Sequence, residues 1–167
     1  MKKPQVNYAF IDGTNLHLGI ADLGWVLDYR RFWVYLNEHY EVNKAYYFIG
    51  YVPGNTGLYN FLQDAGYRLV FKPILNTPEG KIKGNCDAEL VLQAMIDLNK
   101  YEKAILVSSD GDFYCLVNYL LSIDKLDCVL APCEKSCSHL LITATKGKMA
   151  YIDNLKQKLE YIKKRTP

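Results

Sequence analysis

The sequence predicts an α/β fold in which helices cover both faces of a mainly parallel β-sheet. Short apolar segments rich in β-branched and aromatic residues alternate along the chain with stretches whose apolar residues recur at helical spacing. The segment 104–107 is wholly apolar and leads directly into the polar cluster 108–112, as a buried parallel strand does at its carboxyl end. Strands that alternate with helices are joined by crossover connections, and such connections make neighbouring strands parallel.

Five strands and seven helical segments are expected along the chain. Asp28 is a suitable N-cap for the second helix, and Gly66 ends the third. The polar connection 73–85 contains proline and glycine and is expected to form a hairpin or a mobile loop. The expected strands are residues 6–11, 44–51, 67–71, 104–107 and 126–131. The expected helical segments are residues 16–23, 29–40, 58–65, 87–98, 116–121, 138–143 and 153–164.

Length and composition indicate one globular domain that spans residues 1–167. Half of the residues are apolar and 23% are charged, and the net charge of +2 does not by itself indicate nucleic-acid or membrane binding. No apolar run approaches the ~20 residues of a membrane span, and the first residues lack the long apolar segment of a signal peptide. We therefore expect a cytoplasmic protein without a membrane partner.

The five cysteines do not form a strong zinc motif. Cys115 and Cys128 fall within apolar patterns and are most simply explained as small core residues. Cys133 and Cys137 lie near His139, but no second cysteine pair stands at a suitable spacing. Structural zinc is therefore the less favoured alternative.

Acidic residues follow the ends of two strands that are expected to be neighbours. Asp12 ends the first strand, and Asp110 and Asp112 follow the fourth. If the sheet has the order 3-2-1-4-5, these strands are adjacent and the crossover direction reverses between them, which is where open α/β sheets bind ligands. Asp87 opens the helix that leads into the fourth strand. The four carboxylates are therefore expected to lie within a few ångströms of one another.

Four carboxylates without a histidine suit Mg²⁺ or Mn²⁺ rather than zinc. A site of this kind lowers the pKa of a bound water and neutralises the charge of a phosphoryl-transfer transition state. The simpler alternative is that Asp110 or Asp112 caps the following helix and that Asp87 interacts with the first turn of its own helix. Because four acids are expected to converge, the metal site is the favoured interpretation.

Three segments of the chain resemble the signature segments of NYN domains, which are PIN-like nuclease domains related to the LabA proteins. The segments are residues 10–16 (FIDGTNL), 83–87 (KGNCD) and 107–113 (VSSDGDF), and they occur in the family's order. The resemblance extends over nearly the whole chain. It implies a three-layer α/β/α PIN-like fold and an Mg²⁺- or Mn²⁺-dependent ribonuclease, expected to be an endoribonuclease, with DNA not excluded as a substrate. It also allows a homodimer.

The resemblance assigns roles to individual residues of this chain. Asn15 would orient the first acid or a substrate phosphate, and Ser108 would hydrogen-bond within the acidic cluster. Two positions depart from the family pattern: Gln93 stands where many relatives have another acid, and Ser109 stands where glycine is common. The first departure bears on whether a second metal ion is bound. The catalytic and metal-binding acids would be Asp12, Asp87, Asp110 and Asp112.

A catalytically silent RNA-binding or protein-interaction module on the same fold is the alternative function. Basic side chains that are candidates for phosphate contacts are Lys72, Lys81, Lys83, Lys135, Lys146 and Lys148. Candidate stacking surfaces for bases are Tyr51, Tyr59 and Phe113. Loop lysines are more often simply solvated, and aromatic residues at helical or strand spacing are more often core. The presence of all four acids favours catalysis.

Overall fold

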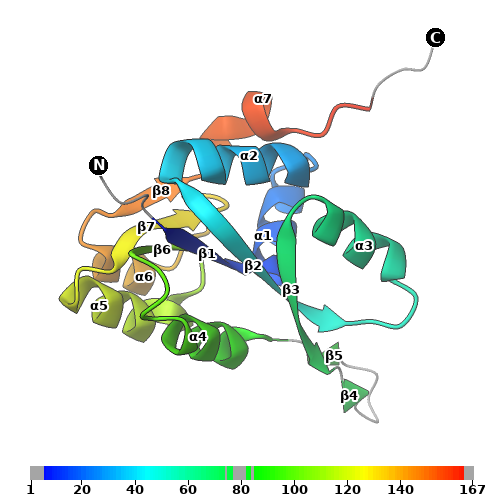
Figure 1. The fold of residues 1–167 in the computed structure, drawn as a ribbon. Helices are drawn as coiled ribbons and strands as arrows, with labels where there is room; N and C mark the ends of the chain where they lie inside the picture. The colour runs from blue at the N-terminus through cyan, green and yellow to red at the C-terminus, as the bar shows by residue number, and fades with distance from the viewer. Residues whose placement is uncertain (1–5, 74, 77–81, 84, 164–167) are drawn as a thin grey trace, which may run out of the picture.

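The main sheet of the computed structural model consists of six parallel strands (Figure 1). The structure describes residues 6–73, 75–76, 82–83 and 85–163. The strands are β1 (Asn7–Asp12), β2 (Val42–Tyr51), β3 (Tyr67–Pro73), β6 (Lys103–Val107), β7 (Leu126–Ala131) and β8 (Met149–Tyr151). They lie in the order β3-β2-β1-β6-β7-β8. The expected order of five strands is confirmed, and β8 adds a sixth strand beside the last of them.

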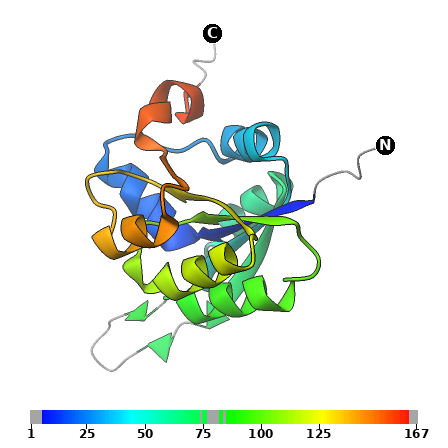
Figure 2. The same ribbon diagram turned by 90° about the vertical axis from the view of Figure 1, so that its left-hand side faces the viewer.

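Helices cover both faces of this sheet and make a three-layer α/β fold (Figure 2). One core lies between the sheet and helices α1, α2, α3 and α7, and the other lies between the sheet and α4, α5 and α6. The helices are α1 (Gly13–Asp22), α2 (Tyr29–Tyr40), α3 (Thr56–Asp64), α4 (Asp87–Ile96), α5 (Tyr114–Ser122), α6 (His139–Thr145) and α7 (Lys156–Leu159), with short 3-10 helices η1 (Gly111–Phe113) and η2 (Asp153–Leu155).

The central strand β1 explains why the strands are apolar on both sides. Ala9 and Ile11 face the α1 and α2 core, whereas Tyr8 and Phe10 face the α4 and α5 core. All four side chains are buried. A parallel strand covered by helices on both faces has no solvent side, so its sequence does not alternate between apolar and polar residues.

The end of the chain differs from the expectation of a helix over residues 153–164. Helical structure stops at Leu159, and Glu160 forms an antiparallel bridge with Leu27. The amide of Tyr161 donates a hydrogen bond to the carbonyl of Val26 at 2.8 Å. The helical pattern was correct up to residue 159, but beyond it a contact with a distant segment replaces the local hydrogen bonds.

The connection between β3 and α4 contains a small antiparallel hairpin outside the main sheet. Its strands are β4 (Leu75–Asn76) and β5 (Ile82–Lys83), with Leu75 opposite Lys83. Of the two expectations for this connection, the hairpin is therefore confirmed. Residues 77–81 lie outside the described part of the chain.

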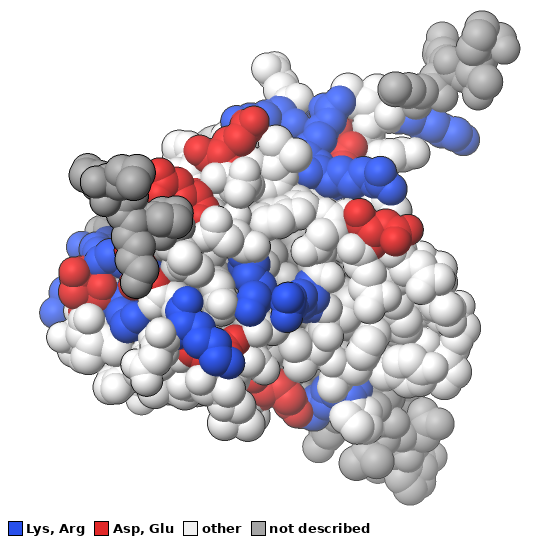
Figure 3. All heavy atoms as spheres, viewed as in Figure 1, with Lys and Arg blue, Asp and Glu red and all other residues white. Residues whose placement is uncertain are grey.

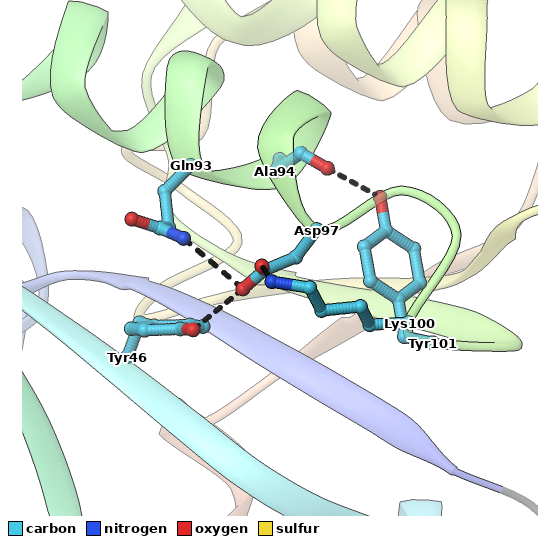
Figure 4. A network of polar contacts seen from close by, with 6 residues as sticks. All are labelled: Tyr46, Gln93, Ala94, Asp97, Lys100 and Tyr101. Atoms are coloured by element: carbon cyan, nitrogen blue, oxygen red, sulfur yellow. Dashed lines mark hydrogen bonds and ion pairs between the residues drawn. The ribbon is translucent and has the colours of Figure 1, made fainter.

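The carboxyl end of α4 is held by a buried aspartate (Figure 4). Asp97 accepts hydrogen bonds from the Tyr46 hydroxyl at 2.5 Å, from Gln93 Nε2 at 3.0 Å and from Lys100 Nζ at 2.7 Å. Burial raises the pKa of Asp97, but these donors together lower it by more than burial raises it. The pKa of Asp97 therefore lies below its usual value. Gln93 therefore bonds near the carboxyl end of α4 and lies roughly 9 Å along the helix from Asp87.

Charge is unevenly distributed over the surface. Lys and Arg side chains gather over α2 and α7, in the upper part of Figure 3. There, Arg30, Arg31 and Lys158 line a shallow groove of about 380 Å³ together with Val34 and Tyr35.

Among the described residues, no helix is long and apolar enough to cross a bilayer.

Candidate metal centre

The candidate site lies where β1 and β6 end side by side. Ile11 is paired with Val107, so Asp12 and the segment that begins with Ser108 leave the sheet at the same edge. Helix α1 then packs on one face of the sheet, and η1 and α5 pack on the other. This is the topological switch point that the strand order predicted.

Three carboxylates from two distant segments converge at this edge. Asp87 at the start of α4 and Asp110 and Asp112 at η1 each offer an oxygen, and these oxygens all lie within 4.8 Å of one another. Asp87 and Asp110 are partly buried, and Asp112 is exposed. Among the described residues, no other group of three or more His, Cys, Asp or Glu side chains is gathered in this way.

Asp12 lies beside this group but is not one of its three members. Its Oδ1 accepts a hydrogen bond from the Asn15 amide at 3.2 Å and caps α1, and its Oδ2 accepts one from Ser108 Oγ at 3.3 Å. Burial, together with the charges of Asp87 and Asp110, raises the pKa of Asp12 to about 6, although the two hydrogen bonds oppose the shift. The Asp12 carboxylate is therefore costly to ionise unless a cation is present.

A network of hydrogen bonds joins the two strand ends. The fully buried Ser108 donates to Asp12 and accepts from the Asp110 amide at 3.1 Å. Asn15 Oδ1 accepts from the amide of Ser109 at 2.9 Å and from its hydroxyl at 3.1 Å. The side chain of Asn15 therefore holds the loop after β6 in place. The hydroxyl of Ser109 thus contributes a bond that glycine could not make.

Asp87 is positioned by a residue whose role the sequence did not reveal. The Asn85 side chain donates to Asp87 Oδ2 at 2.7 Å and accepts from the Asp87 amide at 2.8 Å. Lys72 Nζ donates to the Asn85 carbonyl and lies 3.8 Å from a Glu89 oxygen. An asparagine two residues before the acid is a recognised turn pattern and was the available signal.

The pKa of Asp87 is also raised. Burial is the main cause, and the charges of Asp110 and Asp112 add to it, whereas Asn85 and Lys72 oppose it. Together with the raised pKa of Asp12, this means that the ionised cluster carries unfavourable burial and mutual repulsion. A divalent cation would remove both costs, and the donor set consists only of hard oxygens, so the residues fit Mg²⁺ or Mn²⁺.

Two glycines allow the close packing that brings these segments together. A Cβ atom on Gly13 would lie 2.6 Å from the Phe48 carbonyl oxygen and 2.3 Å from the Tyr47 ring. A Cβ atom on Gly111 would lie 2.4 Å from Ser138 Oγ. A larger side chain at Gly13 would meet the Phe48 backbone and push α1 out of place, whereas one at Gly111 would require the Ser138 side chain to move.

The acids also serve as caps, as the simpler interpretation expected. One oxygen of Asp12 caps α1, and Asp110 Oδ1 accepts from the Asp112 amide at 2.9 Å and caps η1. Capping and clustering are therefore not exclusive, because a carboxylate has two oxygens and several lone pairs.

The candidate nucleic-acid contacts have mixed outcomes. Phe113 and Tyr59 are buried in the core, so their assignment as stacking surfaces was wrong, whereas Tyr51 is half exposed. Phe113 belongs to the core that α4 and α5 cover, and the Tyr59 ring packs against the rings of Tyr51 and Phe71. Lys83 belongs to β5, but its side chain and the whole of Lys81 lie outside the described part of the chain.

Comparison with known proteins supports the resemblance noted in the sequence. The family model of the NYN domain matches residues 8–152. The low amplitude and bright protein LabA from Synechococcus elongatus is 28% identical over 151 residues, which cover 84% of this chain and 74% of that protein. A crystal structure of a protein of unknown function from Vibrio parahaemolyticus has the same fold, with a TM-score of 0.79 and 23% identity over 96% of this chain and 99% of that one. The chain therefore belongs to the NYN domain family.

Proposed function

We propose that this protein is a metal-dependent ribonuclease that hydrolyses phosphodiester bonds of RNA at the Asp87, Asp110 and Asp112 cluster. The observation that supports this most is the convergence of the three carboxylates at the switch point of the sheet. Membership of the NYN family, whose PIN-like domains are generally nucleases, supports the same class of reaction.

The three acids of the cluster and the neighbouring Asp12 would have different roles. Asp87, Asp110 and Asp112 would hold an Mg²⁺ or Mn²⁺ ion. When bound, such an ion neutralises charge on phosphate oxygens and lowers the pKa of water. Asp12, with its pKa raised to about 6, would accept a proton from the attacking water at neutral pH more readily than an ordinary aspartate.

Lys72 would contribute a positive charge beside the acids. Its ammonium group is bonded to the Asn85 carbonyl, and it lowers the pKa of Asp87. Its side chain remains about one-third exposed. A substrate phosphate close to Asp87 would therefore meet a cation as well as the carboxylates, which would otherwise repel it.

A cleavage assay with matched variants tests the proposal. Labelled RNA and DNA oligonucleotides, single-stranded and structured, would be incubated with the protein in Mg²⁺, in Mn²⁺ and in chelator. The test variant is Asp110→Asn, because asparagine retains the oxygen that caps η1 while removing the charge. The control is Asp64→Asn, which removes an exposed carboxylate at the end of α3.

The outcomes separate the candidate functions. We expect metal-dependent RNA products from the parent protein and from Asp64→Asn, and none from Asp110→Asn. Equal cleavage by Asp110→Asn would refute the proposed site. Binding of RNA without products, unaffected by Asp110→Asn, would instead establish the silent binding module, and products from DNA alone would correct the substrate class.

A further inference from the structure

Three aromatic rings cluster where β2 and β3 end, on the side of the sheet that α3 covers. Tyr51 is the last residue of β2, Phe71 lies near the end of β3, and Tyr59 belongs to α3. The rings of Tyr51 and Tyr59 are stacked, with centroids 5.8 Å apart and 29° between their planes. The Phe71 ring lies 4.8 Å from Tyr59 and 5.6 Å from Tyr51, and it is perpendicular to the latter.

Tyr59 is the rigid support of this cluster. Its side chain is only 5% exposed, and its hydroxyl accepts a hydrogen bond from the Val52 amide at 2.8 Å. This bond ties α3 to the residue that directly follows Tyr51. The ring of Tyr51 is therefore held against Tyr59 by packing and by the backbone next to it.

The other two rings remain open to solvent. Tyr51 is 46% exposed and Phe71 is 38% exposed. Because Tyr59 covers one face of the Tyr51 ring, the exposed part of that ring is the side turned away from Tyr59. The perpendicular rings of Tyr51 and Phe71 form an open aromatic corner, with one flat surface and one wall. A planar apolar group would stack on the surface and touch the wall.

The surroundings of the aromatic corner would not repel phosphate groups. Residues 45–63 contain no charged side chain, and the charged residues of β3 are Arg68 and Lys72. The right-hand side of Figure 3, where α3 lies, is correspondingly mostly white. A negatively charged chain at the aromatic corner would therefore meet neutral or basic groups from these segments.

The aromatic corner also lies close to the candidate metal centre. Asp12 at the end of β1 is paired with Phe48, and β2 continues beyond this level to Tyr51. At about 3.3 Å per residue, Tyr51 stands roughly 10 Å further along the strand direction than Asp12. Stacked nucleotides rise about 3.4 Å each, so roughly three of them would span this distance.

Lys72 links the two places. It follows Phe71 in β3, and successive side chains of a strand point to opposite faces. Phe71 therefore lies on the α3 side, whereas Lys72 lies on the α4 side and donates to the Asn85 carbonyl beside Asp87. Because β3 is at the edge of the main sheet, a strand of RNA held at the acids would pass Lys72 and this edge to reach the aromatic corner (Figure 1).

We propose that Tyr51 and Phe71 form a stacking site for an unpaired base of RNA. The proposal rests on the proposed function and makes its substrate class more specific, namely RNA that is single-stranded beside the cleaved bond. Every base has a flat face that can stack on an aromatic side chain, so the site would not select a sequence. A base within a duplex has both faces covered by its neighbours and would not enter the aromatic corner.

Fluorescence anisotropy with labelled oligouridylate in chelator tests the proposal, because binding is then measured without cleavage. The second probe is a chain of the same length whose nucleotides lack bases, so that the phosphates are retained. The test variants are Tyr51→Leu and Phe71→Leu, which keep apolar bulk and remove a ring, and Tyr51→Trp restores a ring. The control is Tyr119→Leu on α5, which removes a tyrosine that is 44% exposed.

We expect the parent to bind oligouridylate more tightly than the base-free chain. Tyr51→Leu should weaken the binding of oligouridylate about tenfold or more and leave that of the base-free chain unchanged, because the lost contact involves only the base. Phe71→Leu should act in the same direction. Tyr51→Trp and Tyr119→Leu should bind both probes as the parent does. Circular dichroism should remain that of the parent for all variants, since the replaced side chains are largely exposed.

Three results would overturn the proposal. The first is equal binding of oligouridylate by the parent and by folded Tyr51→Leu and Phe71→Leu, which would leave the aromatic corner to a protein partner. The second is an equal loss for both probes, because the ring would then not contact a base. The third is a parent that binds no oligouridylate.

Cleavage of RNA with Mg²⁺ or Mn²⁺ present separates this proposal from the proposed function. If both are right, Tyr51→Leu should raise KM about tenfold with kcat nearly unchanged, and the parent should cleave single-stranded RNA in preference to duplex. A parent that does not cleave, but whose affinity for oligouridylate falls in Tyr51→Leu, would refute the nuclease and keep the stacking site. Cleavage by Tyr51→Leu with the KM of the parent would refute the stacking site and keep the nuclease.

Discussion

Replacement of Asp12 by asparagine is expected to stabilise the metal-free protein at neutral pH. The Asp12 carboxylate is partly buried and lies near the charges of Asp87 and Asp110, and its pKa is raised to about 6 from 3.8. Asparagine keeps an oxygen that can accept the Asn15 amide and cap α1. Its amide group can donate to Ser108 Oγ, which donates to Asp12 in the parent. The substitution therefore removes the charge and preserves the local structure.

The magnitude follows from the shift in pKa. A rise of about two pKa units corresponds to at most about 3 kcal/mol, and because Asp12 is only partly buried we expect about 1–3 kcal/mol. The folded protein binds the proton more tightly than the unfolded chain does. The parent therefore loses stability as the pH rises from 3.8 to about 6, and the full loss is present above that range. The advantage of Asp12→Asn should follow the same course.

Urea unfolding monitored by circular dichroism, with chelator present, measures the effect. At about pH 7.5 the midpoint for Asp12→Asn should lie above that of the parent, and at about pH 4.5 the difference should shrink to about one-third of that value. The same variant should lose RNA cleavage. Equal or lower stability at neutral pH would refute the argument that ionised Asp12 is strained by burial and by its acidic neighbours.

Three further substitutions separate the framework of the site from its chemistry. Asn15→Ala removes the acceptor of two hydrogen bonds from Ser109, so it should lower the free energy of unfolding by about 1–3 kcal/mol and reduce cleavage. An unchanged urea midpoint would count against the role of Asn15 in holding the loop after β6. Asp97→Ala leaves the buried Tyr46 hydroxyl without its acceptor and should cost about 2 kcal/mol in urea unfolding while Mn²⁺ affinity stays the same. Cys137→Ser should change neither the metal content nor the urea midpoint by more than about 1 kcal/mol, and loss of bound zinc together with the fold would restore the zinc hypothesis.

The central part of the fold could be predicted because its signals are local and strong. The buried strands appear as short apolar segments, and Asp28 and Gly66 mark helix boundaries through their own conformational preferences. The three residues of β8 are too few for a periodic pattern, so this edge strand was missed. The segment after Leu159 was assigned to a helix because its apolar spacing is helical, but pairing with Leu27 decides its structure.

The acids of the site could be predicted from their positions after strands, because the strand order brings those positions together. The supporting residues could not. Asn85 and Ser109 act through hydrogen bonds whose partners are set by the folded arrangement, and no spacing in the sequence distinguishes them from ordinary turn residues. The burial of Phe113 and Tyr59 likewise depends on which helix face meets the sheet.

Calorimetric titration with Mn²⁺ in the absence of RNA tests the central claim most directly. It would compare the parent protein with Asp110→Asn and with the control Asp64→Asn. If Asp87, Asp110 and Asp112 form the metal site, the parent and Asp64→Asn should bind Mn²⁺ alike, and Asp110→Asn should bind it at least about tenfold more weakly. Equal affinity of the parent and Asp110→Asn, or no binding by the parent, would contradict the account.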